Sequence, residues 1–175
     1  MTNASPLACP DCGFVWDGVD RARAISGIND SVTGFVEVIE LAGEMATVRP
    51  SPERWSTVEY AAHLRDVLIS LRERIITATI VDVPTGTPIH RDDRVNMGFY
   101  ALDSTDDAAE ELGFAAGLIS KAIAALPDGA ENRELYFSPG MPSTVTVGWV
   151  AAQALHEASH HLGDVRQNLR LTVAD

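Results

Sequence analysis

Four long segments of helical hydrophobic periodicity, separated by proline- and glycine-containing breaks, restrict this chain to an all-α fold. The breaks fall at residues 5–13, 49–52, 84–88, 127–129 and 139–143. Between them, apolar residues recur at intervals of three and four, which places them on one face of a helix. The pattern predicts helices over about 20–46, 57–79, 104–126 and 146–169. Four such helices in 175 residues predict a four-helix bundle.

Two of the expected helices begin with explicit capping signals. Ser56 and Glu59 form a capping box, in which each side chain can accept a hydrogen bond from a free backbone N–H of the first turn. Trp55 and Tyr60 flank that box at the spacing of a hydrophobic staple. Ser104 stands in the equivalent place before the third helix. These signals fix where the second and third helices start.

The connection over residues 80–103 is too long for a tight hairpin between neighbouring helices. It predicts a crossover between the second and third helices, or a loop that covers one end of the bundle. A short strand at 135–137 is an alternative to loop in the next connection. We divide the chain into a cysteine-containing segment, residues 1–18, and a bundle domain, residues 19–175.

The charge of the chain excludes some classes of partner. It carries 25 acidic and 13 basic residues, a net charge of −12, and its Lys and Arg residues do not cluster. We therefore expect no nucleic-acid partner. No apolar run approaches the ~20 residues of a membrane span, and the N-terminus lacks the features of a secretory signal. A cytoplasmic protein without a membrane partner is expected.

The histidines carry the strongest chemical signal. His156 and His160 are four residues apart, so their side chains lie on one face of the fourth helix and can reach one metal ion. His63, in the second helix, is the candidate third ligand. His161 points about 100° away from His160 and is interpreted as a supporting or structural residue. His90 lies in the long loop and is expected to be solvated.

Two stretches around these histidines resemble the signatures of a known family. Residues 49–67, with Trp55 and His63, and residues 156–165, with the H-x-x-x-H pair, resemble those of the DinB-like superfamily. This superfamily includes mycothiol- and bacillithiol-dependent transferases and a mycothiol-dependent maleylpyruvate isomerase. The resemblance covers roughly residues 20–170 and implies an up-down-down-up bundle. It also implies a divalent metal held by His63, His156 and His160.

The same resemblance suggests an activity. Three imidazoles leave a coordination position open, where zinc lowers the pKa of water or binds a thiolate ready to attack an electrophile. We expect zinc, with nickel or another transition metal as alternatives, and a thiol S-transferase acting on small electrophiles. In the isomerase branch a glutamate occupies the place of His156, which argues against that activity here.

The composition of the chain indicates its source and its thiol cosubstrate. A single lysine, Lys121, among 13 basic residues is typical of a GC-rich genome. It indicates an actinobacterial-type member of the family, for which mycothiol is the expected thiol cosubstrate. A non-catalytic metal- or ligand-binding stress protein of the same fold is the alternative function. A purely structural helical dimer is a third hypothesis, and a homodimer is compatible with all three.

Carboxylates near the histidines are candidates to orient the ligands. Asp164, four residues after His160, is the best placed, and Glu157 and Asp66 are further candidates. A carboxylate that accepts a hydrogen bond from the far N–H of a ligating imidazole fixes its tautomer.

The segment Cys9–Gly13 has the sequence of half a zinc ribbon, Cys-Pro-Asp-Cys-Gly. Two cysteines cannot complete a four-cysteine site within one chain. The pair could form a reversible disulfide, remain as free thiols, or be half of a metal site completed by histidine or by another subunit. We interpret it first as a structural knuckle.

Overall fold

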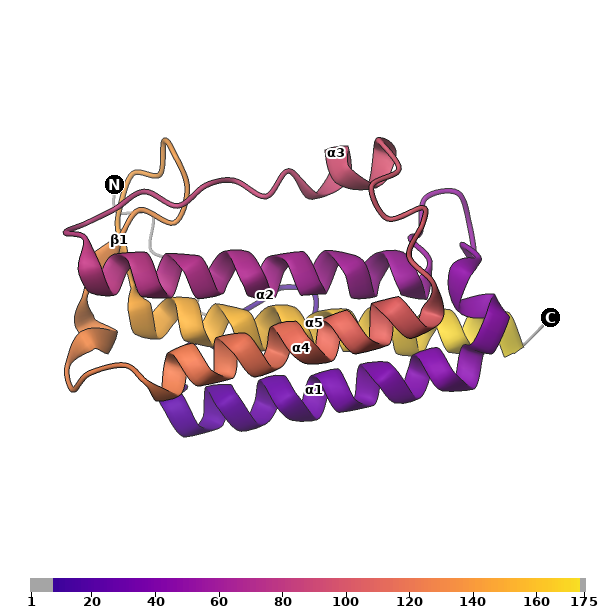
Figure 1. Cartoon of the computed structure of the whole chain (residues 1–175), viewed down its shortest axis with the longest axis horizontal. Helices are drawn as coiled ribbons and strands as arrows, with labels where there is room; N and C mark the ends of the chain where they lie inside the picture. The colour runs from indigo at the N-terminus through magenta and orange to yellow at the C-terminus, as the bar shows by residue number, and fades with distance from the viewer. Residues whose placement is uncertain (1–7, 174–175) are drawn as a thin grey trace.

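Four long helices form the body of the protein in the computed structural model, which describes residues 8–173 (Figure 1). They are α1 (Arg21–Ala42), α2 (Thr57–Ile80), α4 (Thr105–Ala124) and α5 (Val147–Val173). The predicted all-α four-helix bundle is confirmed. Part of the expected segment 1–18, namely residues 1–7, lies outside the described residues.

The helices follow the expected up-down-down-up order. In Figure 1, α1 and α5 run in one direction, and α2 and α4 run in the other. Helix α1 packs on α4 and α5, and α2 packs on the same two helices, so α1 and α2 lie diagonally opposite each other. Because α2 and α4 are parallel, the chain between them must return along the whole length of the bundle.

That return is the predicted crossover, and it contains a short helix, α3 (Arg91–Asn96), which the sequence pattern did not indicate. Asp66 of α2 anchors it. The Asp66 carboxylate accepts a hydrogen bond of 3.0 Å from the Tyr100 hydroxyl and another from the Arg94 guanidinium. The crossover is thus tied to α2 one turn beyond His63.

The capping predictions are confirmed. Ser56 and Glu59 form the reciprocal capping box at the start of α2, and Ser104 caps α4 through the backbone N–H of Asp107. The rings of Trp55 and Tyr60 pack with centroids 5.3 Å apart. The ends of the other helices differ from expectation. Helix α1 stops before Gly43, which adopts a φ of 53°, and a 3₁₀ turn, η1 (Gly43–Thr47), follows.

The connection from α4 to α5 contains a 3₁₀ turn, η2 (Ala130–Asn132), and a two-stranded antiparallel ribbon. Strand β1 (Glu134–Leu135) pairs with β2 (Val145–Thr146), with Leu135 opposite Val145. The strand expected at 135–137 is therefore present, but it begins one residue earlier and ends two residues earlier. Just beyond β1, Tyr136 pairs with the crossover through backbone hydrogen bonds to Pro84 and from Gly86.

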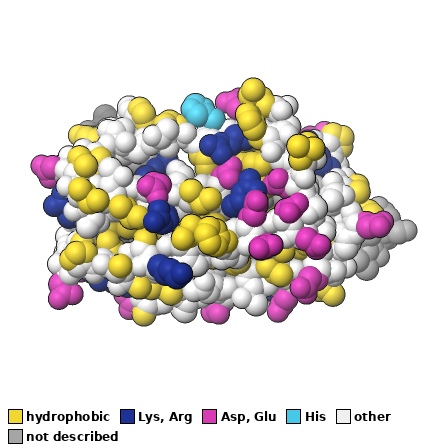
Figure 2. All heavy atoms as spheres, viewed as in Figure 1, with side chains coloured by type: hydrophobic (Ala, Val, Ile, Leu, Met, Phe, Trp, Pro, Cys, Tyr) yellow, Lys and Arg dark blue, Asp and Glu magenta, His cyan; other side chains and the backbone are white. Residues whose placement is uncertain are grey.

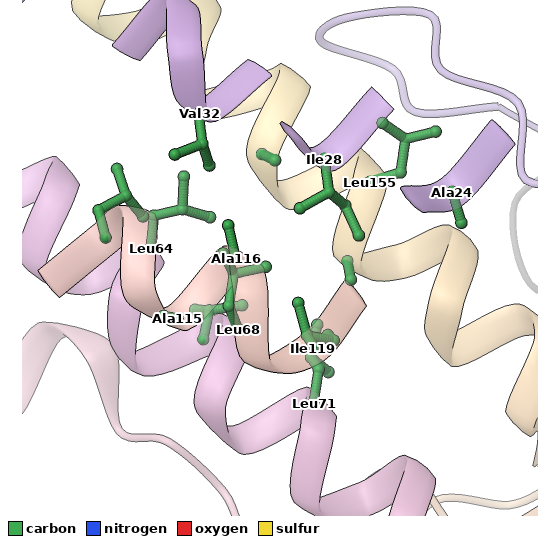
Figure 3. Close-up of a cluster of buried hydrophobic side chains, with 14 of the residues drawn as sticks. Ala24, Ile28, Val32, Leu64, Leu68, Leu71, Ala115, Ala116, Ile119 and Leu155 are labelled. Atoms are coloured by element: carbon green, nitrogen blue, oxygen red, sulfur yellow. The ribbon is translucent and has the colours of Figure 1, made fainter. Parts of the chain in front are cut away.

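The bundle interior is a continuous layer of aliphatic side chains contributed by all four helices (Figure 3). Ile28 of α1, Leu64 and Leu68 of α2, and Ile119 of α4 are fully buried. On the face drawn in Figure 2, Lys and Arg side chains lie scattered among Asp and Glu side chains. Among the described residues, no helix is both long and apolar enough to cross a membrane.

Candidate metal centre

Helix α5 carries two pairs of potential metal ligands that are offset by one residue. His156 and His160 form one pair, and Glu157 and His161 form the other. Both pairs have the i, i+4 spacing that places two side chains on one helical face. A one-residue offset rotates the second pair by about 100° around the helix. The two pairs therefore face different surroundings and belong to two separate clusters.

The inner cluster consists of His63, Glu157 and His161, whose potential ligand atoms all lie within 4.8 Å of one another. His63 reaches it from α2, and the other two come from α5, which packs on α2. The His63 side chain is almost fully buried, with 2% of its surface exposed, and His161 is 7% exposed. The rings of His63 and His161 meet edge to face, with centroids 5.1 Å apart.

Both ring nitrogens of His161 face carboxylates, and Nε2 is the one that lies in the inner cluster. Its Nδ1 lies 2.9 Å from a carboxylate oxygen of Asp164, and its Nε2 lies 3.4 Å from Oε2 of Glu157. With a proton on Nδ1, the lone pair of Nε2 faces a carboxylate oxygen. Two such electron pairs at this distance repel unless a proton or a cation lies between them. A divalent cation suits this arrangement.

One buried nitrogen of the inner cluster has no hydrogen-bond partner. Nδ1 of His63 is inaccessible to solvent and makes no hydrogen bond. Burial, and then the nearby His161, lower the pKa of His63 to about 4, so the ring is neutral at pH 7. A neutral imidazole is the form that binds metals. The donor set of two imidazoles and one carboxylate is one that catalytic zinc and other divalent metals use.

Glu157 and His161, the two members of the inner cluster that come from α5, stabilise each other's charge. Burial opposes ionisation of Glu157, but the hydrogen bond and charge of His161 outweigh it and lower the pKa of Glu157 to about 2. Burial likewise opposes the charging of His161, but Asp164 and Glu157 together raise its pKa. Gln153 fixes the other carboxylate oxygen of Glu157, to which its Nε2 donates a hydrogen bond of 2.7 Å. Glu157 is therefore an ionised and oriented carboxylate.

A cavity of about 180 Å³ opens beside the inner cluster. His63 and Glu157 contribute to its wall, together with Arg74 of α2 and Arg91 and Ile89 of the crossover. A larger cavity of about 410 Å³ shares Ser70 and Arg74 with it. The open side of the metal-ligand set therefore faces a space that is lined by cationic side chains.

Arg74 is an unusual residue in this wall. It is 9% exposed and forms no ion pair with the described carboxylates; burial lowers its pKa, and the charge of Glu157 only partly opposes that effect. One Arg74 nitrogen donates to the carbonyl of Thr87, the group packs 4.2 Å from the ring centroid of Phe137, and Nε has no partner. A buried guanidinium without a counter-ion is a recognition element for a carboxylate or phosphate.

Gly86 allows the crossover to pass over this arginine. A Cβ atom at position 86 would lie 2.6 Å from Nε of Arg74 and 2.6 Å from the carbonyl oxygen of Phe137. The first atom belongs to a flexible side chain, but the second belongs to the backbone. Any larger residue would therefore displace the wall of the cavity.

The outer cluster consists of Cys9, Cys12, His156 and His160, whose ligand atoms also lie within 4.8 Å of one another. Both cysteines are free thiols, and Sγ of Cys9 lies 4.0 Å from Nδ1 of His160. The N-terminal segment thus covers the half-buried face of α5. It brings the two cysteines to the H-x-x-x-H pair and not to the inner cluster.

The three expected ligands are consequently divided between two places. His63 lies in the inner cluster, whereas His156 and His160 lie in the outer cluster, and no group of described residues within 4.8 Å unites all three. His161, interpreted above as a supporting residue, takes the place beside His63 that was expected for His160. The physical reason is rotation, since residues 157 and 161 of α5 face α2 and residues 156 and 160 face the N-terminal segment.

The candidate orienting carboxylates have three different surroundings. Glu157 is a member of the inner cluster itself. Asp164 contacts His161 at 2.9 Å and is farther from His160, whose Nε2 lies 3.8 Å away. Asp66 accepts hydrogen bonds from Arg65 and Tyr100 and anchors the crossover. His90 is exposed in the crossover, as expected, with 67% of its side-chain surface accessible.

A family model for the DinB superfamily matches residues 35–165, three quarters of the chain. The chain belongs to the DinB superfamily. The match includes the inner cluster and the α5 half of the outer cluster, but not Cys9 and Cys12. No curated protein sequence matches this DinB-superfamily chain.

Among solved structures, the chain is similar to YfiT from Bacillus subtilis, described as a probable metal-dependent hydrolase with an unusual four-helix bundle topology. The TM-score is 0.78, the sequence identity is 12%, and the match covers 88% of this chain and 90% of YfiT. At this identity the similarity establishes a shared fold. It agrees with the up-down-down-up order derived above.

Proposed function

We propose that this DinB-superfamily protein is a divalent-metal-dependent enzyme whose metal is held by His63, Glu157 and His161. The observation that carries the proposal is the buried cluster of two imidazoles and one carboxylate beside a cavity. Three protein ligands and an adjoining space are typical of catalytic sites, because structural zinc sites use four protein ligands and are closed. When bound there, a divalent metal supplies Lewis acidity and an open position for a thiol or for water.

The substrate we propose is a small electrophile that bears a carboxylate. The cavity volume of about 180 Å³ limits its size. The buried guanidinium of Arg74 would bind its carboxylate, and Arg91, an exposed residue of the cavity wall, would attract it. The adjoining cavity of about 410 Å³ could admit the second reactant. Desolvation by the surrounding crossover would strengthen the pairing with Arg74.

For the reaction we propose thiol addition, as transfer or as isomerisation, with mycothiol as the first thiol to test and zinc as the first metal. The argument against an isomerase was that His156 replaces a glutamate. That argument depends on the 156/160 pair, whereas the pair beside His63 is Glu157 and His161, which begins with a glutamate. Hydrolysis is the competing reaction, because YfiT is described as a probable metal-dependent hydrolase.

Maleate is a suitable probe, since it is a small dicarboxylate electrophile whose thiol adduct and trans isomer are both visible by NMR. We expect zinc- or nickel-loaded protein with mycothiol to convert maleate, and Glu157→Gln and His161→Ala variants to lose the conversion. Arg74→Met should raise KM for maleate by about 10–100-fold, the range for losing a charge-assisted contact. The same substitution should leave the KM for dimethyl maleate, which is neutral, unchanged.

The matched control is Arg72→Met on the same helix, because Arg72 pairs with Glu73 and does not line this cavity. If the protein hydrolyses model esters without any thiol, and the same variants lose that activity, hydrolysis replaces thiol addition as the proposed reaction. A protein that binds metal in the inner cluster but converts neither class of compound would be a non-catalytic binding protein.

A further inference from the structure

The outer cluster has the composition and spacing of a structural zinc site. Cys9 and Cys12 have the C-x-x-C spacing of a metal-binding knuckle, and His156 and His160 have the H-x-x-x-H spacing of a helix that binds zinc. In small zinc domains the two halves follow each other closely. Here α1, α2 and α4 lie between them, and the fold brings the halves together.

The geometry of the knuckle fits this use. Gly13 adopts a φ of 72°, and its N–H donates to the carbonyl of Cys9 over 2.9 Å, which closes a tight turn around the cysteines. The N–H of Cys9 in turn donates to the carbonyl of Phe14 over 2.8 Å. The backbone N–H of Cys12 lowers the pKa of Cys9, while burial raises the pKa of Cys12.

His156 supplies an independent observation. Both of its ring nitrogens are inaccessible to solvent, and neither has a hydrogen-bond partner. Phe14 and Trp16 pack on its ring, with centroids 5.2 Å and 4.8 Å away. Leaving a buried polar group without a partner costs about 1–3 kcal/mol. A metal ion bound to one nitrogen would remove part of that cost.

We propose that Cys9, Cys12, His156 and His160 bind one zinc ion, which fastens the N-terminal segment to α5. A tetrahedral ion with Zn–S near 2.3 Å and Zn–N near 2.0 Å keeps its ligand atoms roughly 3.3–3.8 Å apart. The four atoms already lie within 4.8 Å of one another, so only small side-chain rotations are required. Binding displaces the two thiol protons, and thiolate ligands select zinc over magnesium or calcium.

This zinc site would also support the inner cluster. Directly after the knuckle, the indole N–H of Trp16 donates to Oε1 of Gln153 over 2.7 Å. The amide of Gln153 then donates to Glu157 over 2.7 Å. Trp16 also stacks on Trp149 of α5. Fastening the knuckle therefore holds Trp16, and through Gln153 it holds the carboxylate of the inner cluster.

Cobalt titration of the reduced, metal-free full-length protein tests the proposal, because only the outer cluster contains thiolates. We expect a thiolate-to-cobalt charge-transfer band that saturates at one equivalent for this site. Cys12→Ser and His160→Ala should each lower the affinity read from the band by more than about 100-fold. His63→Ala should retain the band, since His63 lies outside the outer cluster.

Cys12 is exposed and has no core packing, so its variant should keep the helical circular dichroism of the parent. Zinc should displace the cobalt and protect both thiols from alkylation. Absence of the band in the parent protein would overturn the proposal. A band that survives both His156→Ala and His160→Ala would also overturn it, because the cysteines would then bind metal without the histidines. A Cys9–Cys12 disulfide that forms in air despite saturating zinc would replace the metal site by a redox pair.

Discussion

The inner and outer clusters use the same helix in opposite ways. Helix α5 gives Glu157 and His161 to the inner cluster, where a single residue from α2 completes a set of three beside a cavity. It gives His156 and His160 to the outer cluster, where two cysteines complete a set of four under aromatic rings. The inner set adjoins a cavity, whereas the rings of Phe14 and Trp16 pack on His156 of the outer set.

Rotation about the axis of α5, and not residue spacing, decides which cluster each pair of side chains joins. Both pairs satisfy the same four-residue rule, and each lies one residue from the other. The pair that faces the bundle meets a buried neutral histidine and a basic cavity. The pair that faces outward meets the N-terminal knuckle. One helix can therefore serve a catalytic-type centre and a structural-type centre at once.

Of the variants, His63→Ala should produce the largest difference in metal affinity between the two clusters. Removing the only α2 ligand should weaken inner-cluster metal binding by more than about 100-fold and leave outer-cluster binding unchanged. Calorimetric zinc titration measures both classes of site in one experiment. The matched control is His90→Asn, since His90 is exposed and asparagine tolerates its left-handed φ of 51°. Loss of both metals in His63→Ala would contradict the separation.

A smaller effect on metal affinity is expected for Gln153, the residue that connects the two clusters. Gln153→Ala removes the hydrogen bonds that join Trp16 to Glu157. Because an outer partner of a metal ligand is worth about 10–100-fold in affinity, inner-cluster binding should weaken by that amount. Zinc titration of this variant beside Gln167→Ala, an exposed glutamine of the same helix, measures it. Equal affinities in the two variants would show that Glu157 needs no support from Gln153.

Trp55→Ala tests the wall of the inner cluster through stability. The indole is half-buried and contacts the rings of Tyr60 and His63 at centroid distances of 5.3 Å and 5.2 Å. A fully buried indole would cost ~3–5 kcal/mol of unfolding free energy when it is removed, and because this indole is half-buried we expect about 2–3 kcal/mol. Denaturant unfolding of the zinc-free protein measures it. A cost below about 0.5 kcal/mol, typical of an exposed side chain, would contradict this packing.

Ser56→Ala should have the smallest effect. Loss of the N-cap should cost ~1 kcal/mol of stability, while packing along α2 keeps His63, two turns downstream, in place. Metal binding at either cluster should change little. Thermal melting and zinc titration on the same sample separate the two effects. If Ser56→Ala lost the inner metal as completely as His63→Ala with an unchanged melting temperature, Ser56 would belong to the site.

Much of the fold could be predicted because its signals are local. The caps at Ser56 and Ser104 and the apolar periodicity define the starts of α2 and α4 without reference to the rest of the chain. The short helix α3 was missed because it is stabilised by contacts from elsewhere, including those of Arg94 and Tyr100 with Asp66. Six residues of helix carry too little periodicity of their own.

The candidate site was harder to predict, because its members come together only through helix packing. The residue types and the α2 histidine could be read from the sequence. The choice between the 156/160 and 157/161 pairs could not be made from spacing. One signal did favour the second pair, since Val150 and Ala154 are core residues and lie one heptad before Glu157 and His161. Arg74 gave no signal, since only its burial without an ion-pair partner distinguishes it from other arginines.

The central claim, that α5 serves two metal sites with two different ligand pairs, is tested most directly by locating zinc in crystals. Anomalous diffraction at the zinc absorption edge, on protein purified without a histidine tag and soaked in zinc, gives the positions. We predict two peaks. One should lie among His63, Glu157 and His161, and the other among Cys9, Cys12, His156 and His160. A single peak bound by His63, His156 and His160 together would contradict the account.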